Sequence, residues 1–391
     1  MRVYFGVCGI GLGHVGRCIP VANRLRKAGN EVAFSTYKEA VSYVKQEKFP
    51  LFEAPPIYFA VRPDGGVDFR LTTAKPGIFS IFIFLNQLKA EIEFLKKYSP
   101  DFVVSDSRLS TIIAASLLKI PAVTILNVYR ITIPREKRFL SLAKIADGGI
   151  LTVIGKIWTM SKAVLVPDFP SPYTLSIGNL AVPPWRKDKI KLIGPTIPIR
   201  AEDLPEREEI RRSLGLDDRP LIFVPISGSP EERAYFTCLM KQLLKDFPKD
   251  YQIIMSLGSP DSSTEPVKTE NMIIYDWLPN RFEVLKACDL VVSRASLGTL
   301  TQAICYGKPL ILIPTPNQTE QLNNARRAEE LGVATVLDQK KLNYAQLLST
   351  VQEFFMSDRY KAGAEEIQRE VSKYDAIETM VKMITGFVGQ S

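Results

Sequence analysis

Short apolar runs alternate with helix-length stretches of mixed polarity along the first half of the chain. The runs are rich in β-branched and aromatic residues, as buried strands are, and the longer stretches carry apolar residues at helical spacing. Strands that alternate with helices predict parallel βαβ units and a doubly wound sheet. The predicted strands are residues 3–9, 31–36, 101–107 and 122–127, and the clearest predicted helices are residues 15–29 and 111–120.

The pattern is interrupted between Leu192 and Arg219, where prolines and charged residues replace the apolar runs. A second strand-and-helix series follows, which predicts a second doubly wound sheet. Two such sheets place a ligand cleft between the carboxyl ends of their strands. We predict domains over residues 1–195 and 196–375, and a C-terminal helix in residues 376–391 that packs back on the first domain. The second series of strands comprises residues 221–229, 251–259, 271–277, 287–296, 309–316 and 333–337.

Composition narrows the class of protein. The 391 residues are 46% hydrophobic and 24% charged, with a net charge of +8, which is typical of a globular protein and too weakly basic for a nucleic-acid partner. The five cysteines form no C-x-x-C pair, which favours a reducing compartment over a disulfide framework or structural zinc. No apolar run has the 18 residues that a transmembrane helix needs. We therefore expect a cytoplasmic protein.

A glycine-rich turn, Gly11-Leu12-Gly13-His14-Val15-Gly16, follows the first predicted strand and opens the first predicted helix. Glycines allow the backbone to approach a ligand closely, and the free N–H groups of a helix start attract an anion. A dinucleotide site is one interpretation, but it calls for an acidic residue at the end of the second strand. That strand ends in Phe34-Ser35-Thr36-Tyr37 instead. A purely structural interpretation is that the glycines allow the strand and the helix to pack tightly.

His14 is the only histidine in the sequence. It lies just after the glycine turn, at the predicted cleft, where an imidazole can act as a general base near neutral pH. A carboxylate commonly orients such a base, and Asp106 ends a strand at the same edge of the same sheet. We predict His14 as the base and Asp106 as its partner. The alternatives are a histidine without chemical consequence and an aspartate that caps a helix.

Residues 276–325 hold the most specific signal. Their order and spacing resemble the GT-B glycosyltransferases, in particular the MurG-like branch, family 28 of the UDP-glycosyltransferase superfamily. The turn from Gly11 to Arg17 is similar to the glycine-rich turn near the start of the same superfamily. The residues that carry the resemblance in the second half are Asp276-Trp277-Leu278-Pro279, Ser293-Arg294, Thr299, Gln302, Gly307-Lys308-Pro309, Pro314, Glu320-Gln321 and Asn324-Ala325.

The resemblance implies a GT-B fold, with two Rossmann-like domains facing each other across a cleft. It also implies inverting transfer of a hexosyl or N-acetylhexosaminyl unit from a UDP-sugar to an acceptor hydroxyl. The turn before residue 298 would present N–H groups to the phosphates, and Arg294 would add a charge-assisted contact. The implied donor-binding residues are Gly11, Gly13, Ser227, Gly228, Trp277, Leu278, Arg294, Ser296, Gly298, Thr299, Gln302, Glu320 and Gln321, the last two at the sugar hydroxyls.

No D-x-D sequence occurs, so we expect no essential metal and no cofactor, with helix dipoles and Arg294 stabilising the leaving diphosphate. Two positions depart from the family pattern. Gln302 replaces the glutamate that usually binds the ribose hydroxyls, and Ser296 replaces the usual glycine of the phosphate turn, with Gly298 displaced. Two other functions therefore stay open: a UDP-sugar epimerase on the same fold, and a nucleotide-sugar or lipid-binding protein without catalysis.

Two segments bear on the acceptor. Residues 74–98 begin with an apolar, aromatic run and continue as an amphipathic helix, and residues 130–162 interleave seven Lys or Arg with apolar residues. A basic amphipathic surface can lie on anionic lipid. One interpretation is therefore a polyprenyl-linked or other lipid acceptor, with the protein peripheral on the inner face of the membrane. The other is that both segments pack on the sheet and present a solvated basic face.

Overall fold

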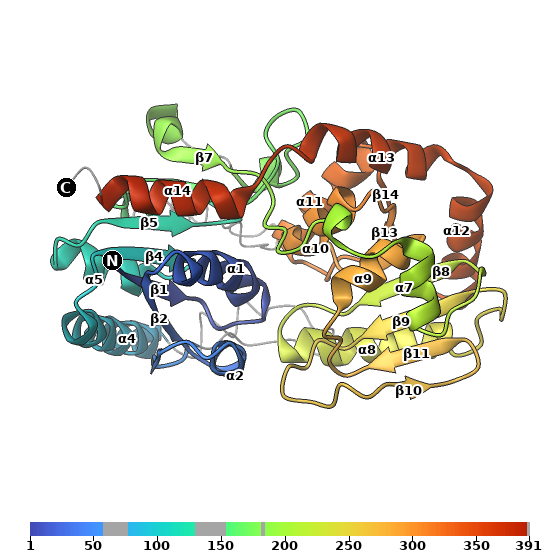
Figure 1. The fold of residues 1–391 in the computed structure, drawn as a ribbon, viewed down its shortest axis with the longest axis horizontal. Helices are drawn as coiled ribbons and strands as arrows, with labels where there is room; N and C mark the ends of the chain where they lie inside the picture. The colour runs from blue at the N-terminus through green and yellow to red at the C-terminus, as the bar shows by residue number, and fades with distance from the viewer. Residues whose placement is uncertain (58–76, 130–153, 181–183, 389–391) are drawn as a thin grey trace.

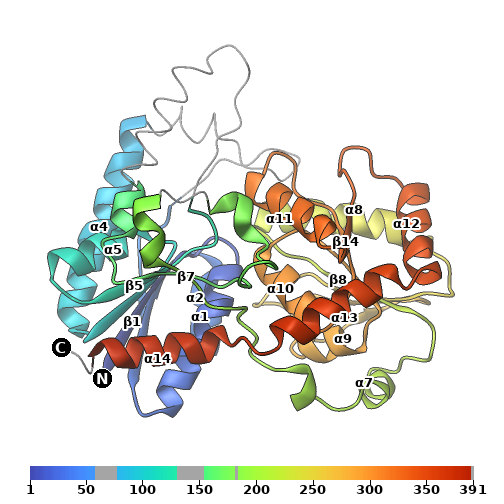
Figure 2. The same ribbon diagram turned by 90° about the horizontal axis from the view of Figure 1, so that it is seen from above.

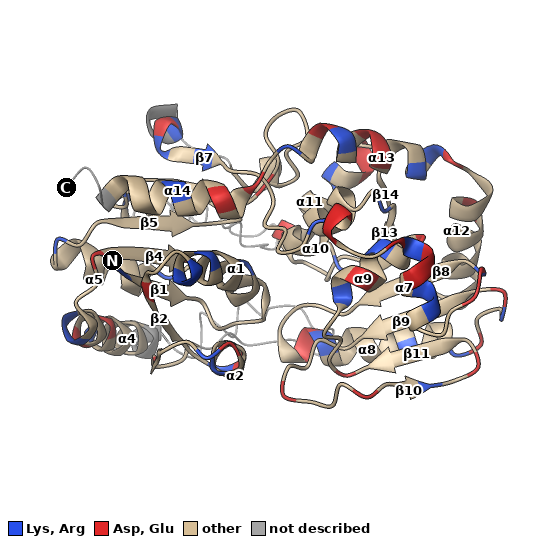
Figure 3. Cartoon of the chain, viewed as in Figure 1, with Lys and Arg blue, Asp and Glu red and all other residues tan. Residues whose placement is uncertain are grey.

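The computed structural model describes residues 1–57, 77–129, 154–180 and 184–388. It shows two α/β domains side by side, each built on a seven-stranded sheet (Figure 1). Charged side chains gather on the helices and loops, whereas the strands are almost free of them (Figure 3). Helices on both faces explain this pattern, because strands covered on both sides must be apolar throughout. The predicted fold of two doubly wound sheets is confirmed.

The first sheet is parallel, in the order β3-β2-β1-β4-β5-β6-β7. The chain order reverses between β1 and β4, which is where such sheets bind ligands. The strands are β1 (Arg2–Val7), β2 (Glu31–Thr36), β3 (Leu51–Glu53), β4 (Phe102–Asp106), β5 (Ala122–Ile125), β6 (Val164–Val166) and β7 (Ile190–Leu192). The helices are α1 (Gly13–Lys27), α2 (Glu39–Gln46), α4 (Gly77–Tyr98) and α5 (Leu109–Leu117), with short 3₁₀ segments η2 (Ser176–Asn179) and η3 (Pro184–Lys189).

The second sheet has the order β10-β11-β9-β8-β12-β13-β14, and only the edge strand β10 is antiparallel to its neighbour. Its reversal point lies between β8 and β12. The strands are β8 (Leu221–Pro225), β9 (Gln252–Ser256), β10 (Val267–Lys268), β11 (Met272–Tyr275), β12 (Leu290–Ser293), β13 (Leu310–Leu312) and β14 (Ala334–Val336). Its helices are α7 (Arg207–Ser213), α8 (Pro230–Leu244), α9 (Arg281–Ala287), α10 (Leu297–Cys305), α11 (Thr319–Glu330), α12 (Tyr344–Met356) and α13 (Arg359–Val371), with a short 3₁₀ segment η4 (Ala201–Asp203). The last helix of the chain is α14 (Ala376–Val388).

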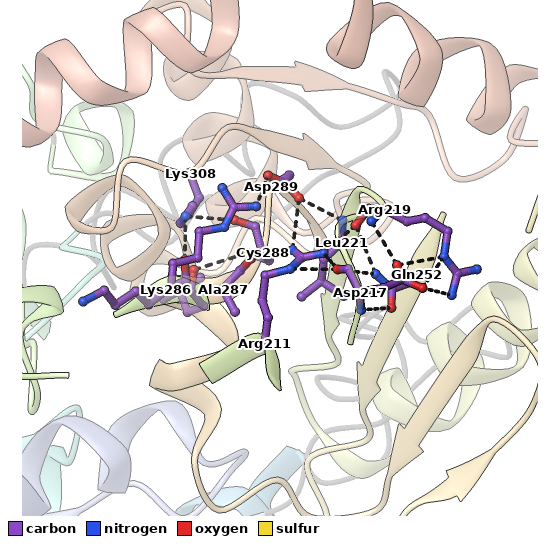
Figure 4. A network of polar contacts seen from close by, with 12 residues as sticks. Arg211, Asp217, Arg219, Leu221, Gln252, Lys286, Ala287, Cys288, Asp289 and Lys308 are labelled. Carbon is purple, nitrogen blue, oxygen red and sulfur yellow. Dashed lines mark hydrogen bonds and ion pairs between the residues drawn. The ribbon is translucent and has the colours of Figure 1, made fainter. Parts of the chain in front are cut away.

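A polar network fastens α7 to the amino ends of β8 and β12, at the edge of the sheet away from the cleft (Figure 4). Asp289 accepts a hydrogen bond from the backbone N–H of Leu221 at 2.9 Å and pairs with Arg207 and Arg211. The buried Arg211 also donates to the carbonyl of Ala287 at 3.2 Å. Because the guanidinium has several acceptors around it, the buried charge is compensated.

The last helix crosses back to the first domain. α13 lies against the second domain and α14 against the first (Figures 1 and 2). Ala376, Met380 and Ile384 of α14 are fully buried in the core of the first domain, and Phe387 stacks on Phe102 with ring centroids 6.0 Å apart. The first domain therefore includes residues from the far end of the chain.

The two segments that cross between the domains touch each other. Arg200 donates to the carbonyl of Ser372 at 2.8 Å and pairs with Asp375 at 3.4 Å. The backbone N–H of Ala376 donates to the carbonyl of Pro195 at 3.3 Å. The two domains are thus connected by two neighbouring segments of the chain, residues 195–200 and 372–376, at one side of the molecule.

Candidate active site

A cleft of about 1390 Å³ lies between the two domains. Its walls are the turns that follow β1 in the first domain and β8, β11, β12 and β13 in the second, so it lies at the carboxyl ends of parallel strands. Thirteen of the fifteen residues predicted for the site line this cleft. They are Gly11, Gly13, His14, Ser227, Gly228, Trp277, Leu278, Ser296, Gly298, Thr299, Gln302, Glu320 and Gln321.

The glycine turn after β1 touches the opposite domain. Gly11 has a φ of +69°, which favours glycine, and a Cβ placed there would lie 3.2 Å from the carbonyl oxygen of Gly228. The helix α1 begins at Gly13 without a side-chain cap at Leu12. Its first N–H groups are therefore open to the cleft, as an anion-binding helix start requires.

His14 lies in the first turn of α1 and contacts Asp106. Its Nδ1 is 2.7 Å from Asp106 Oδ1. The contact arises because β1 and β4 are neighbours in register, with Val7 opposite Asp106, so the turn after β1 passes over the end of β4. The side chain of His14 is 26% exposed and that of Asp106 is fully buried. One side of the imidazole therefore contacts a buried carboxylate, and the rest of the ring is accessible from the cleft. This is the arrangement of an oriented general base.

Asp106 is held in its ionised form. Burial alone would raise the pKa of this carboxyl, but the Arg17 guanidinium and His14 beside it hold the pKa well below its usual range. Arg17 donates from Nη2 to Oδ1 at 2.6 Å and from Nε to Oδ2, and the thiol of Cys18 lies 3.4 Å from Oδ2. The carboxylate thus keeps its negative charge with no contact to solvent.

In the second domain, the helices α8 and α10 both begin at the cleft, and their N-termini differ. The start of α8 is closed by a capping box, in which Ser229 accepts from the N–H of Glu232 at 3.3 Å and Glu232 accepts from the N–H of Ser229 at 2.8 Å. The start of α10 has no side-chain cap at Ser296. Its N–H groups are therefore available to an anion.

Three hydroxyl groups gather at the start of α10. Ser296 Oγ donates to Thr299 Oγ1 at 2.9 Å and lies 3.3 Å from Ser227 Oγ, which comes from the turn after β8. The exposed Gly298 adds no side chain at this point. Small hydroxyl side chains beside free N–H groups form a cradle suited to phosphate oxygens.

The remaining cleft residues surround this cradle. Trp277 packs edge-on against Tyr43 of the first domain, with centroids 5.9 Å apart. The side chain of Leu278 is buried in the core of the second domain. Gln321 accepts from the N–H of Thr315 at 2.8 Å, which fixes its amide. Gln302 is half-buried on α10.

Arg294 requires a correction. It does not line the cleft, and its side chain is fully buried. Its guanidinium lies 4.1 Å from the ring centroid of Phe236 on α8 and donates to the carbonyl of Ile313 at 2.9 Å and to Gln339. The chain leaves β12 at Ser293, and the next side chain points into the layer between the sheet and α8. Arg294 is thus a structural cation, and the predicted direct contact with phosphate does not fit this geometry.

Models of two glycosyltransferase families match the chain. The glycosyltransferase family 28 C-terminal domain matches residues 221–380 and glycosyl transferase family 1 matches residues 1–193. The chain belongs to the GT-B glycosyltransferases. Uncharacterized glycosyltransferases of Methanosarcina acetivorans and Methanosarcina mazei are 26% and 25% identical to it, each covering all of this chain and 99% of the relative.

More distant relatives agree with this GT-B assignment. A UDP-N-acetylglucosamine–N-acetylmuramyl-(pentapeptide) pyrophosphoryl-undecaprenol N-acetylglucosamine transferase of Thermoanaerobacter sp. is 31% identical over 211 residues, which cover 51% of this chain and 57% of that enzyme. The calicheamicin glycosyltransferase CalG4 superposes with a TM-score of 0.67 at 18% identity, covering 100% of this chain and 98% of CalG4. The spinosyn rhamnosyltransferase SpnG complexed with thymidine diphosphate superposes with a TM-score of 0.66 at 15% identity, covering 98% and 100%.

The structure of this glycosyltransferase adds cleft residues that sequence reasoning missed. Arg17 and Asn127 lie beside the pair of His14 and Asp106. The signals were present, since Arg17 is three residues after His14 on one helix face and Asn127 follows the end of β5. Glu39 and Arg233, which pair across the cleft, had no local signal.

Within the described ranges, no three or more His, Cys, Asp or Glu residues come together as metal ligands would. Among the same residues, no helix is long and apolar enough to cross a bilayer.

Proposed function

We propose that this glycosyltransferase transfers a hexosyl or N-acetylhexosaminyl unit from a UDP-sugar to an acceptor hydroxyl, with inversion at the anomeric carbon. The observation that carries the proposal is the contact between His14 and Asp106 in a cleft whose opposite wall holds the open start of α10. A base on one side and a diphosphate cradle on the other are the two parts that an in-line displacement needs.

In the proposed reaction, Asp106 accepts the Nδ1–H of His14, so that Nε2 carries a lone pair towards the cleft. Nε2 takes the proton of the acceptor hydroxyl while the hydroxyl oxygen forms a bond to the anomeric carbon. The bond between that carbon and the diphosphate oxygen breaks, and the electron pair leaves with the nucleotide. Attack from the face opposite the leaving group inverts the anomeric centre.

The start of α10 would bind the leaving diphosphate. Its free N–H groups and positive dipole end stabilise negative charge without reorganisation. Ser296, Thr299 and Ser227 would donate hydroxyl hydrogen bonds to the phosphate oxygens, and the absence of a side chain at Gly298 lets an oxygen approach the backbone. Glu320 and Gln321, at the start of α11, would bind the sugar hydroxyls.

The proposal of UDP as the donor nucleotide rests on the family resemblance and on the name of a relative. One relative carries UDP-N-acetylglucosamine in its name, whereas a structural neighbour holds thymidine diphosphate. Gln302 replaces the usual ribose-binding glutamate, and an amide accepts hydrogen bonds from a diol less strongly than a carboxylate does. We therefore propose UDP as the donor nucleotide and treat dTDP as the outcome that would correct it.

We further propose that the acceptor is lipid-linked and is met at the inner face of a membrane by a peripheral protein. The support is on α4, where Ile81, Phe82 and Leu85 are 60%, 61% and 50% exposed. The C-terminal half of the same helix packs on the sheet through the fully buried Leu95. Of the second basic segment, residues 130–153 lie outside the described residues, and Trp158 is buried in the core.

Calorimetric titration with UDP, GDP, dTDP and NADPH tests the donor site. Selective micromolar binding of UDP is the expected result, and binding of NADPH alone would contradict a glycosyltransferase donor site. Incubation with UDP-sugars and a polyprenyl-linked acceptor that carries a free sugar hydroxyl then separates transfer from its alternatives. Conversion of the donor sugar without any acceptor would indicate an epimerase, and binding without turnover a non-catalytic protein.

A further inference from the structure

Asp106 has more partners than an oriented base requires. Besides His14, both of its carboxylate oxygens accept hydrogen bonds from Arg17, from Nη2 to Oδ1 at 2.6 Å and from Nε to Oδ2. The same Nη2 lies 3.1 Å from His14 Nδ1. A bidentate guanidinium fixes the plane of the carboxylate as well as its charge. Arg17 therefore determines how Asp106 can hold the imidazole.

Arg17 also reaches towards the second domain. Its Nη1 donates to Asn127 Oδ1, and Asn127 lies next to the carboxylate of Glu320, which belongs to the far wall of the cleft. Burial raises the pKa of Glu320, and the nearby charges of His14 and Arg17 oppose that rise. Asp106, Arg17 and Asn127 are thus hydrogen-bonded in series from the buried end of β4 to the cleft, and Glu320 at the start of α11 lies next to the last of them.

The charges of Asp106, Arg17 and Glu320 affect how readily His14 accepts a proton. A neutral imidazole beside a lone carboxylate gains stabilisation when it accepts a proton, whereas Arg17 cancels the charge of Asp106. Glu320, when ionised, adds a negative charge near His14, but only when the second domain is close to the first. The charged and titratable groups around His14 are Arg17 and Cys18 of α1, Asp106 of β4, Glu320 of α11 and, beyond it, Glu232 of α8.

We propose that Arg17 is a positioning residue that couples the base to the donor: it orients Asp106 for His14 and, through Asn127, orients Glu320 for the transferred sugar. The assignment rests on the proposed function, because it assumes that His14 is the base and that Glu320 meets the sugar. It predicts that loss of Arg17 changes both the protonation of His14 and the binding of the sugar part of the donor.

NMR titration of His14 tests the first half without any substrate. Because the chain has a single histidine, its imidazole signals need no assignment. Arg17→Gln removes a cation that lies beside the ring and frees the charge of Asp106, so the ring should accept a proton more readily and its signals should change at higher pH than in wild type. Arg26→Gln, which removes an exposed arginine from the same helix, should leave the midpoint where it is. An unchanged midpoint in folded Arg17→Gln overturns the proposal.

A pH profile extends this test to activity. The base must be unprotonated, so a higher midpoint moves the acid limb of kcat/KM to higher pH, and the loss in Arg17→Gln should recover in alkaline buffer. A pH-independent loss of kcat/KM would indicate a structural role and contradict the proposal.

The second half is tested with donor fragments. Arg17→Lys keeps the charge but lacks the planar fork that binds both oxygens of Asp106 and, through a third nitrogen, Asn127. It is also the variant to use if Arg17→Gln does not fold. It should weaken binding of the UDP-sugar roughly tenfold and leave binding of UDP alone unchanged. Equal binding of the UDP-sugar by wild type and variant overturns the coupling. If wild type binds no UDP at all, the proposed function fails, while the His14 titration still decides the role of Arg17.

Discussion

The carboxylate of Glu39 on α2 pairs with the guanidinium of Arg233 on α8, across the cleft and 194 residues away in the chain. The same guanidinium donates to the carbonyl of Gly228 at 3.2 Å. This ion pair therefore closes one side of the cleft and supports the turn that faces the glycine turn after β1. We expect it to hold the domains together when no substrate is bound.

Substitution of either partner tests this role. Glu39→Gln and Arg233→Gln should each increase the radius of gyration measured by small-angle X-ray scattering. A double-mutant cycle on thermal unfolding should give a coupling of about 1 kcal/mol, since residues in direct contact are not additive. Fully additive effects, or an unchanged radius in both variants, would show that the domains stay together without this pair.

His14→Ala should remove most turnover, because a positioned base contributes about 10² to 10⁴ in rate. Binding of UDP should be unaffected, since the phosphate cradle lies on the other wall of the cleft. Rates are to be measured at saturating donor and acceptor, with UDP affinity determined on the same protein by calorimetry. A variant as active as wild type would refute the assignment of the base.

Gln302→Glu should strengthen binding of UDP roughly tenfold, because a carboxylate accepts stronger hydrogen bonds from the ribose hydroxyls than an amide does. Binding of dTDP, whose deoxyribose lacks the 2′-hydroxyl, is the internal control and should change less. Calorimetry with both nucleotides measures the difference. Equal changes for the two would place Gln302 away from the ribose.

Glu320→Gln should stabilise the protein at neutral pH. Burial raises the pKa of Glu320 in the folded state, while an unfolded glutamate titrates near about 4.3. Between these two values the folded protein keeps a proton that the unfolded chain has lost, so wild-type stability falls as pH rises through that window. The variant cannot ionise and escapes this loss. Thermal unfolding from pH 4 to 8 should show its advantage growing with pH, and a less stable variant at pH 8 would contradict the argument.

Met380→Ala should destabilise the first domain by about 2 to 5 kcal/mol, because the side chain is fully buried in the core of that domain. Met356→Ala, at an 80% exposed position at the end of α12, is the matched control and should change stability by less than about 0.5 kcal/mol. In Met380→Ala, the backbone amides of β1 and β4 should lose protection from hydrogen exchange. Loss of protection confined to β8 and β12, in the second domain, would contradict this expectation.

Ten of the strands could be inferred from the sequence because their runs are mainly apolar and end in a turn of small or polar residues, whereas β3, β6, β7 and β10, which are only two or three residues long, were not predicted. That pattern also places a glycine turn and Asp106 at one edge of one sheet, where the structure brings His14 and Asp106 into contact. The residues at strand ends therefore help to locate the site in the sequence, because the carboxyl ends of parallel strands lie at the edge of the sheet where ligands bind.

The direction in which a side chain points after the end of a strand cannot be inferred from the apolar pattern of the sequence. Arg294 matches a family motif, yet it points towards Phe236, which is on another helix and 58 positions earlier in the sequence. The pairing of Glu39 with Arg233 depends on how the two domains lie against each other, and no local pattern reports that. Such contacts depend on tertiary packing and become visible only in the folded molecule.

The return of α14 to the first domain has a consequence for biosynthesis. The ribosome releases residues 1–195 first, but the core they form is complete only when Ala376, Met380 and Ile384 have been added. At translation rates of about 5 to 20 residues per second, the intervening chain takes roughly 10 to 40 seconds to make. Throughout that interval the nascent first domain lacks one of its helices, and its apolar groove is a place where a chaperone can bind before the chain is finished.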